Sequence, residues 1–332
     1  MSLINVKENV GIPKYKQIIT SIENAILDGA LKKGDKIPSI NSIKNKFPLS
    51  RDTVLKAYNV LKLRGIVHAI AGKGYYIKSE NITVSQKVFL LFDELNSFKE
   101  DLYNSFLSNL CKNTQVDIYF HHFNYNVFSK LIQESIGNYN SYIIMPGNFN
   151  NTYKIIKNLP KEKVYILDQT NSELKHYSSI YQNFEKGIFN NLTSVSNHLI
   201  KYNKLLLLFQ ENKQPKGMLS GFEEFCKKND FDFEVVNSLT NKTPIEGELY
   251  IIPDDRNLIL LIKKLKEENL NIGEQIGIIS YNETLLKEIV EGGITTISTD
   301  FKKMGKTLAQ MIINKEQLSI ENPTTLTFRK SI

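Results

Sequence analysis

Residues 38–76 constrain the fold of this chain most, because they combine two helix-start signals with two glycine turns. Ser39 and Ser50 each stand where a serine side chain can cap the first turn of a helix. Gly65 is typical of the residue that follows a helix C-terminus. Beyond it, two short apolar runs flank Gly72-Lys73-Gly74, as in a β-hairpin. These residues therefore predict two helices followed by a hairpin.

The apolar spacing predicts one more helix before this region and a buried face within it. Isoleucines recur at helical spacing after Pro13, and Gly29 is placed to end a helix over residues 13–28. Pro48 ends the second helix. The third helix is expected to bury one stripe, made of Val54, Ala57, Tyr58 and Leu61. Three helices and a hairpin in this order predict a winged helix-turn-helix domain.

The basic excess of the chain is confined to the same region. Residues 1–80 contain 14 lysines and arginines against 6 acidic residues, whereas residues 81–332 contain 28 against 29. A basic domain ahead of a neutral one is typical of a protein that binds a phosphate backbone. A solvated basic surface without a partner would give the same count, so charge by itself leaves the two interpretations equal.

Four motifs in this region resemble those of the GntR-type winged-helix transcription regulators. They are Pro13-Lys14-Tyr15-Lys16-Gln17-Ile18, residues 29–39, residues 50–54 and the glycines of residues 72–74. The resemblance implies that the N-terminus of the third helix enters the major groove of DNA. It also implies that the wing approaches a phosphate or the minor groove closely.

The resemblance assigns DNA contacts to both helices and to the wing. Arg51 can offer a bidentate fork to a guanine or to a phosphate, and we favour the phosphate. Many relatives carry arginine at the positions of Asn41 and Leu55, so base readout is expected to rest on Arg51, Asn41 and Lys56. For Lys56 and Lys73, a plain solvated lysine is the competing interpretation. The expected DNA-binding residues are Ser39, Asn41, Ser50, Arg51, Asp52, Thr53, Lys56, Gly72, Lys73 and Gly74.

From residue 87 the chain alternates short apolar runs with longer amphipathic segments. Apolar strands separated by helices predict parallel sheets that are covered on both faces, in a doubly wound α/β architecture. A segment of about 245 residues with this pattern suggests two lobes. The expected strands are residues 88–92, 116–120, 142–145, 164–167, 205–209, 233–236, 249–252 and 276–280. The expected domains are residues 1–78 and 87–332, joined by a polar linker over residues 79–86.

The last part of the chain resembles the ligand-binding core of the lactose-repressor family, which is similar to periplasmic sugar-binding proteins. The motifs that carry the resemblance are residues 267–273, 276–282, 294–297 and 300–305, within a match that covers residues 87–332. The resemblance implies that a small molecule binds between two lobes, at the carboxyl ends of the strands.

Residues that follow strands are the implied effector contacts. Carboxylates and amides suit a polyhydroxylated ligand, and an aromatic ring packs against the C–H face of a sugar. Helix caps and loop acids are the competing interpretations for the aspartates and the asparagine, and a core position competes for the phenylalanine. Relatives commonly carry arginine where this chain has Met218. The expected effector-binding residues are Asp93, Asp168, Met218, Asp254, Asn282 and Phe301.

Signatures of other functional classes are missing from the sequence. The longest apolar run, residues 205–209, is far short of the ~20 residues that cross a bilayer, and no signal-peptide core is present, so a cytoplasmic location is expected. Neither Cys111 and Cys226 nor the five histidines show metal-ligand spacing. No nucleophile, zinc or phosphate-loop motif occurs, so neither a cofactor nor an enzymatic activity is expected. An enzyme built on the α/β domain with an appended DNA-binding domain is the alternative.

The combined prediction is a ligand-responsive transcription regulator, expected to be a repressor. It is expected to bind double-stranded operator DNA as a homodimer, because two half-sites must lie at a spacing that the dimer sets. The expected effector is a small polar molecule such as a sugar or sugar derivative. Whether that effector releases or promotes DNA binding stays open.

Overall fold

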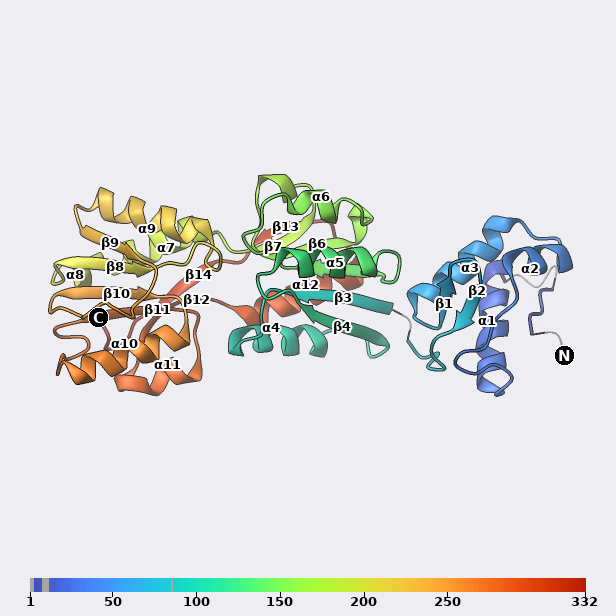
Figure 1. Cartoon of the computed structure of the whole chain (residues 1–332), viewed down its shortest axis with the longest axis horizontal. Coiled ribbons are helices and arrows are strands. Elements are labelled where there is room, and N and C mark those ends of the chain that lie inside the picture. The colour runs from blue at the N-terminus through green and yellow to red at the C-terminus, as the bar shows by residue number, and fades with distance from the viewer. Residues whose placement is uncertain (1–2, 8–11, 85) are drawn as a thin grey trace.

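The first three helices and the hairpin fold into a small winged domain at one end of the molecule (Figure 1). The computed structural model describes residues 3–7, 12–84 and 86–332. The elements of the winged domain are α1 (Lys14–Leu27), α2 (Ile40–Lys46), α3 (Arg51–Leu63), β1 (Val67–Ile70) and β2 (Gly74–Ile77). All four expected stripe residues of α3 are buried, and the Tyr58 hydroxyl donates to the carbonyl of Pro38 over 2.5 Å. The predicted winged helix-turn-helix is therefore confirmed.

The first α/β lobe follows the winged domain and is built on a six-stranded, all-parallel sheet in the order β13-β7-β6-β5-β3-β4. Its strands are β3 (Gln86–Phe92), β4 (Thr114–Phe120), β5 (Ser141–Ile144), β6 (Val164–Asp168), β7 (Ser178–Tyr181) and β13 (Ser319–Glu321). Its helices are α4 (Ser97–Ser108), α5 (Tyr125–Ser135), α6 (Thr152–Ile156) and α12 (Phe301–Asn314), with short 3-10 turns at Lys161–Lys163 and Ser172–Leu174. Alternate residues of β3 enter two different cores, because helices cover both faces of the sheet.

The second lobe repeats this plan with the strand order β14-β12-β11-β10-β8-β9, in which only β14 runs antiparallel. Its strands are β8 (Lys204–Leu208), β9 (Asp232–Val236), β10 (Glu248–Ile252), β11 (Gly277–Tyr281), β12 (Thr295–Thr299) and β14 (Thr324–Thr327). Its helices are α7 (Phe184–Ser194), α8 (Ser196–Leu199), α9 (Lys216–Lys228), α10 (Asp255–Glu267) and α11 (Leu285–Ile289), with a 3-10 turn at Val290–Gly292. The predicted two-lobed, doubly wound architecture is confirmed.

Four strands, β7, β12, β13 and β14, were not predicted, because their sequences are rich in serine and threonine and show no apolar run. Several of their hydroxyl groups make hydrogen bonds to distant segments instead. The Ser179 and Ser319 hydroxyls lie 2.7 Å apart across the β7–β13 pair, and the Thr295 hydroxyl donates to the Arg329 carbonyl over 3.1 Å. Tertiary hydrogen bonding thus builds strands that hydrophobic pattern does not signal.

The chain passes between the two lobes three times, after β7, after β12 and after β13. Two of these crossings are bonded together: the Asn322 side-chain amide donates to the Thr299 hydroxyl over 2.7 Å and to the Asp300 carbonyl over 3.1 Å. These crossings join two independently packed cores.

Candidate DNA interface and interlobe cleft

The first turn of α3 presents a charged and hydroxyl-rich surface. Ser50 caps the helix, because its Oγ accepts a hydrogen bond from the Thr53 amide over 3.1 Å and lies 2.9 Å from the Thr53 hydroxyl. Arg51 and Asp52 are exposed beside this cap. The positive end of the helix dipole and the Arg51 guanidinium therefore lie at the same surface, an arrangement that attracts anions.

Among the other expected DNA contacts on α2 and α3, Ser39 caps a helix, whereas Asn41 and Lys56 are exposed to solvent. Ser39 caps α2 by accepting from the Ser42 amide over 3.1 Å, whereas Asn41 is exposed. Lys56 is exposed on α3, and its Nζ lies 4.4 Å from the ring centroid of Tyr15. This cation–π contact directs the Lys56 side chain. Tyr15, from the first of the four motifs, is thus a supporting residue that the sequence did not single out.

The wing tip is formed by the predicted glycine turn. Gly72 and Gly74 have φ angles of +71° and +106°, and the Lys73 amide donates to the Ile70 carbonyl over 3.0 Å. A Cβ at Gly72 would meet no atom within 4 Å, so the backbone conformation and not space requires glycine there. Lys73 is exposed at the tip.

Arg64 ties the end of α3 to the segment that leads into the first lobe. Its guanidinium donates to the Val84 carbonyl over 2.8 Å and to the Ile82 carbonyl over 2.7 Å. The same group lies 2.5 Å from the Glu23 carboxylate of α1. Arg64 therefore bonds the expected linker to the winged domain at two points, and Ser85 of the linker lies outside the described residues.

Lys87 forms the other half of this junction, near the start of β3. Its Nζ lies 3.0 Å from Asp117 Oδ2 and 5.0 Å from the ring centroid of Tyr139, whose hydroxyl donates to the same carboxylate over 2.9 Å. Burial would raise the pKa of Asp117, but hydrogen bonds from Lys87, Gln115 and Tyr139 keep that pKa below its ordinary value. A Cβ built on Gly65 would lie 3.0 Å from Lys87 Cδ, so the winged domain contacts the first lobe at this lysine.

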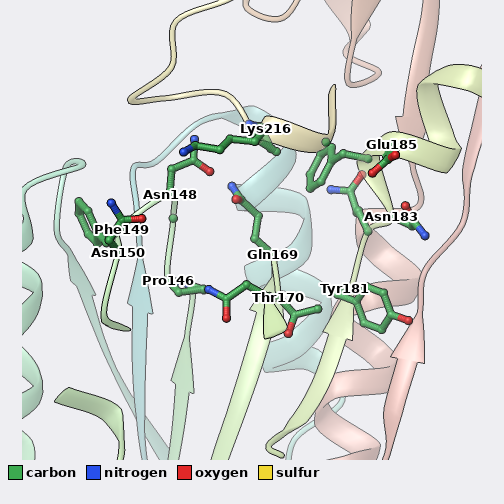
Figure 2. Close-up of a pocket in the computed structure, with 16 residues that line it drawn as sticks. Pro146, Asn148, Phe149, Asn150, Gln169, Thr170, Tyr181, Asn183, Glu185 and Lys216 are labelled. Atoms are coloured by element: carbon green, nitrogen blue, oxygen red, sulfur yellow. The ribbon is translucent and has the colours of Figure 1, made fainter. Parts of the chain in front are cut away.

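A cavity of about 430 Å³ lies between the two lobes (Figure 2). Its walls come from the loops after β5 and β6, from the crossing after β7 and from the start of α9. Six amide side chains line it, against one carboxylate and one ammonium group. The lining residues are Pro146, Gly147, Asn148, Phe149, Asn150, Gln169, Thr170, Asn171, Tyr181, Gln182, Asn183, Phe184, Glu185, Pro215, Lys216 and Gly217. An amide-rich lining offers paired donors and acceptors, which suit a neutral ligand with several hydroxyl groups.

Side chains from both lobes meet across this cavity. Figure 2 shows Gln169 pointing into its middle, between Asn148 of the first lobe and Asn183 of the crossing, with Lys216 of the second lobe above it. The Asn148 side-chain amide also donates to the carbonyl of Glu211 over 3.1 Å and to that of Gln214. Asn148 therefore links the lobes directly.

Two of the expected effector residues, Asp93 and Asp168, form a buried polar cluster next to the cavity and do not line it. Asp93 is paired with Lys99. Asp168 has φ +71° and accepts from Gln182, a lining residue, over 2.6 Å. Burial raises the pKa of Asp168 to about 6; Asp93 adds to this shift, while Lys99 and Gln182 oppose it. Asp168 is therefore placed to position Gln182 at the cavity wall.

The other four expected effector residues are also absent from the cavity wall. Met218 and Phe301 are buried in the cores of the second and the first lobe, respectively. Asp254 caps α10 by accepting from the Asn257 amide over 3.0 Å, and Asn282 turns the chain with φ +63°. Asp254 and Phe301 thus match the helix-cap and core interpretations, whereas Met218 is a core residue and Asn282 a turn residue.

Several residues that line the cavity were not predicted from the sequence, and two of them are direct neighbours of residues that were. Gln169 is the neighbour of Asp168, and Gly217 is the neighbour of Met218. The Asn-rich loop at residues 146–150 was the available signal, because it follows β5 at the same sheet edge.

Metal-binding groups and membrane-spanning helices can also be assessed in the part of the chain that the structure describes. There, no group of three or more histidine, cysteine, aspartate or glutamate side chains could hold a metal ion. Among the same residues, no helix is long and apolar enough to cross a membrane.

Comparison with known proteins agrees with this two-part architecture. The family model described as bacterial regulatory proteins, gntR family, matches residues 14–77, and the periplasmic binding protein-like domain matches residues 201–332. The HTH-type transcriptional repressor YtrA of Bacillus subtilis is 34% identical over 100 residues, which are 30% of this chain and 73% of YtrA. The arabinose metabolism transcriptional repressor of Geobacillus stearothermophilus is 22% identical and aligns over 97% of this chain and 96% of its own length.

Solved structures share the fold of the two lobes. A dimeric Lac repressor with a C-terminal deletion superimposes with a TM-score of 0.64 at 14% identity, over 74% of this chain and 98% of that one. A periplasmic binding protein/LacI transcriptional regulator from Alkaliphilus metalliredigens, complexed with D-xylulofuranose, gives 0.60 at 14% identity, over 74% of this chain and 99% of that one. The fold is that of a DNA-binding domain joined to a periplasmic-binding-protein-like domain. The chain belongs to the GntR family of bacterial regulatory proteins and is a transcription regulator.

Proposed function

We propose that this regulator is a repressor that binds operator DNA as a homodimer and responds to a neutral sugar or sugar derivative in the interlobe cavity. The observation that carries the proposal is an amide-lined cavity between two lobes that are joined to a winged helix-turn-helix domain. The G. stearothermophilus relative is named an arabinose metabolism repressor, and the A. metalliredigens structure contains D-xylulofuranose. Both names support a sugar as the effector class.

On the DNA side, Arg51, Asn41 and Lys56 supply the exposed side chains that reach base edges or phosphates. Lys73 and the wing glycines approach the backbone beside the groove. Ser39 and Ser50 act through the helix ends that they cap, because their hydroxyls already accept amide hydrogen bonds.

On the effector side, Gln169, Asn148 and Asn183 are the central contacts. Each amide offers both a donor and an acceptor, so it can bond two neighbouring hydroxyl groups. Asp168 and Asp93 support this surface from the buried cluster. The functional units are residues 1–78 for DNA, 79–86 as the connection and 87–332 for the effector.

The test is a thermal-shift screen of the full chain against neutral pentoses and hexoses, each compared with its phosphate ester. At least one neutral sugar is expected to raise Tm, because a ligand at 100 times its Kd adds about 2.7 kcal/mol to the unfolding free energy. Gln169→Ala is expected to remove the shift, whereas Gln133→Ala, at an exposed position on α5, should leave it unchanged.

The same sugar should then change the affinity of the full chain for an operator selected from random DNA, since effector and DNA binding are linked through one conformational equilibrium. A screen in which only phosphate esters stabilise the chain would contradict the neutral-sugar assignment. A sugar that binds without altering DNA affinity would contradict the regulatory role of the cavity.

A further inference from the structure

A crevice of about 190 Å³ lies where the winged domain meets the first lobe. Its walls come from the last turn of α3 and the base of the wing on one side, and from β3, β4 and the end of α5 on the other. At about 30 Å³ per water molecule, this volume corresponds to about six waters. The crevice is therefore large enough for a small ligand, such as a phosphate group with a short substituent.

Basic side chains dominate the wall of this crevice. Lys62, Lys78 and Lys87 line it together with His68. A single carboxylate, that of the exposed Glu134, belongs to the same wall. The interlobe cavity, by comparison, has one ammonium group and one carboxylate. The two spaces therefore suit ligands of different charge.

Two of these ammonium groups have no counterion. Lys87 Nζ is paired with Asp117 Oδ2 at 3.0 Å. By contrast, no group of residues 3–7, 12–84 and 86–332 forms an ion pair or a hydrogen bond with the ammonium groups of Lys62 and Lys78. Lys62 nevertheless reaches the first lobe, because a Cβ built on Gly137 would lie 3.7 Å from its Nζ. The positive charge on both sides of the crevice mouth is thus not balanced by the protein.

His68 adds an unsatisfied polar atom at the same place. Its Nδ1 is buried and has no hydrogen-bond partner in the described part of the chain. Buried polar atoms without a partner are uncommon in folded proteins. A phosphate oxygen is an acceptor for both an imidazole N–H and a lysine ammonium group.

We propose that this crevice binds the phosphate group of a small molecule, as a second ligand site separate from the interlobe cavity. Two unpaired ammonium groups match the charge of about −2 that a phosphate monoester carries at neutral pH. Because the walls belong to both the winged domain and the first lobe, a bound phosphate stabilises the arrangement of these two domains described here. The site gives the regulator a second input at the domain junction.

A phosphate of the DNA backbone has the same chemistry, but the position of the crevice favours a free ligand. Lys62 lies in the last turn of α3 and Arg51 in the first, about 16 Å apart at 1.5 Å per residue. His68 lies on β1 at the base of the wing, whereas Gly72 lies at its tip. The crevice is therefore remote from both expected points of DNA contact.

The test compares inorganic phosphate with chloride at equal ionic strength, by thermal unfolding and calorimetric titration of the full chain. Phosphate is expected to raise the Tm of the wild type more than chloride does. Lys62→Met and Lys78→Met should each weaken phosphate binding about tenfold, because each removes a charge-assisted contact. The matched control is Lys32→Met, at an exposed position of the winged domain outside the crevice, which should leave the affinity unchanged.

A gain of binding tests the site independently, because misfolding cannot produce it. Glu134→Gln removes the lining carboxylate at an exposed position, so phosphate affinity should rise about threefold. Gln169→Ala, in the interlobe cavity, should leave the phosphate response intact.

Equal effects of phosphate and chloride on the wild type would overturn the site, as would a phosphate response that survives both lysine substitutions. Titrations of operator DNA in phosphate-free buffer distinguish the two sources of phosphate. Lys62→Met and Lys78→Met should bind the operator as the wild type does. A tenfold loss of operator affinity in these variants would assign the two lysines to the DNA backbone and overturn the proposal.

Discussion

Arg51 lies where two favourable features for DNA binding meet, namely an exposed guanidinium and the capped N-terminus of α3. We expect Arg51→Ala to weaken operator binding at least tenfold and to leave the fold intact, because the side chain is outside the buried stripe. If Arg51 contacts a phosphate, the salt dependence of log K should fall by about one unit of slope.

The measurement is fluorescence anisotropy of labelled operator over a salt series. Lys44→Ala is the control, because Lys44 is exposed on α2 but is not an expected contact. Equal affinities for wild type and Arg51→Ala would remove Arg51 from the interface. A loss of affinity without a change of slope would indicate base readout instead.

Asp168 is a buried carboxyl group with a pKa raised to about 6 by burial. Because its pKa in the folded state exceeds that in the unfolded state, ionisation of Asp168 lowers stability as the pH rises toward 6. Asp168→Asn removes this titration. It keeps an acceptor for Gln182, and asparagine tolerates the positive φ of this position. The unfolding free energy of the variant relative to that of the wild type should therefore rise by about 2 kcal/mol between pH 4 and pH 7.

Urea unfolding of wild type and variant at several pH values measures this gap. Taking the difference cancels the titration of other groups, including Asp117, whose pKa is shifted in the opposite direction. A gap that stays constant over this pH range would show that Asp168 does not titrate as its environment indicates.

At the scale of elements, the junction between α3 and β3 determines how the winged domain is attached. Arg64 bonds the connecting segment, and Lys87 contacts Gly65 while it pairs with Asp117. These contacts connect the C-terminus of α3 to β3, the first strand of the first lobe. We therefore expect a movement of the first lobe to reach α3 through packed groups and not through a free tether.

We expect Lys87→Met to reduce the effect of sugar on operator affinity, with each ligand still bound when it is offered alone. The substitution preserves the length of the side chain but removes its pairing with Asp117 and Tyr139. Lys204→Met is the matched control, because Lys204 begins β8 and pairs with Glu234 of the adjacent strand in the second lobe, remote from the junction (Figure 1). Unchanged coupling in Lys87→Met would show that the signal takes another route.

At the scale of the whole molecule, the DNA-binding helix and the interlobe cavity belong to different parts of the chain. The winged domain is joined to the first lobe through β3, and the cavity lies between the first and the second lobe (Figure 1). In the proposed dimer, we expect closure of the cavity around an effector to change the distance between the two α3 helices, and this distance must match the spacing of the two operator half-sites.

Local signals in the sequence predicted most of the elements and their order. Ser39 and Ser50 cap helices, Gly72 adopts positive φ, and the α3 stripe is buried, because caps, turns and helical periodicity depend on residues a few positions apart. The eight apolar strands were visible for the same reason. Basic charge and motif order likewise located the DNA-binding domain.

Only the tertiary structure decided which side chains meet in the cavity. Gln169 lines the cavity, whereas its neighbour Asp168 is buried beside it. The position at which each strand ends determines which of two neighbouring residues points into the cavity. Asn148 reaches the second lobe only because three chain crossings place that lobe opposite it. The junction at Arg64 and Lys87 has the same origin: contacts between distant segments depend on how whole domains are placed, and no short-range pattern encodes that placement.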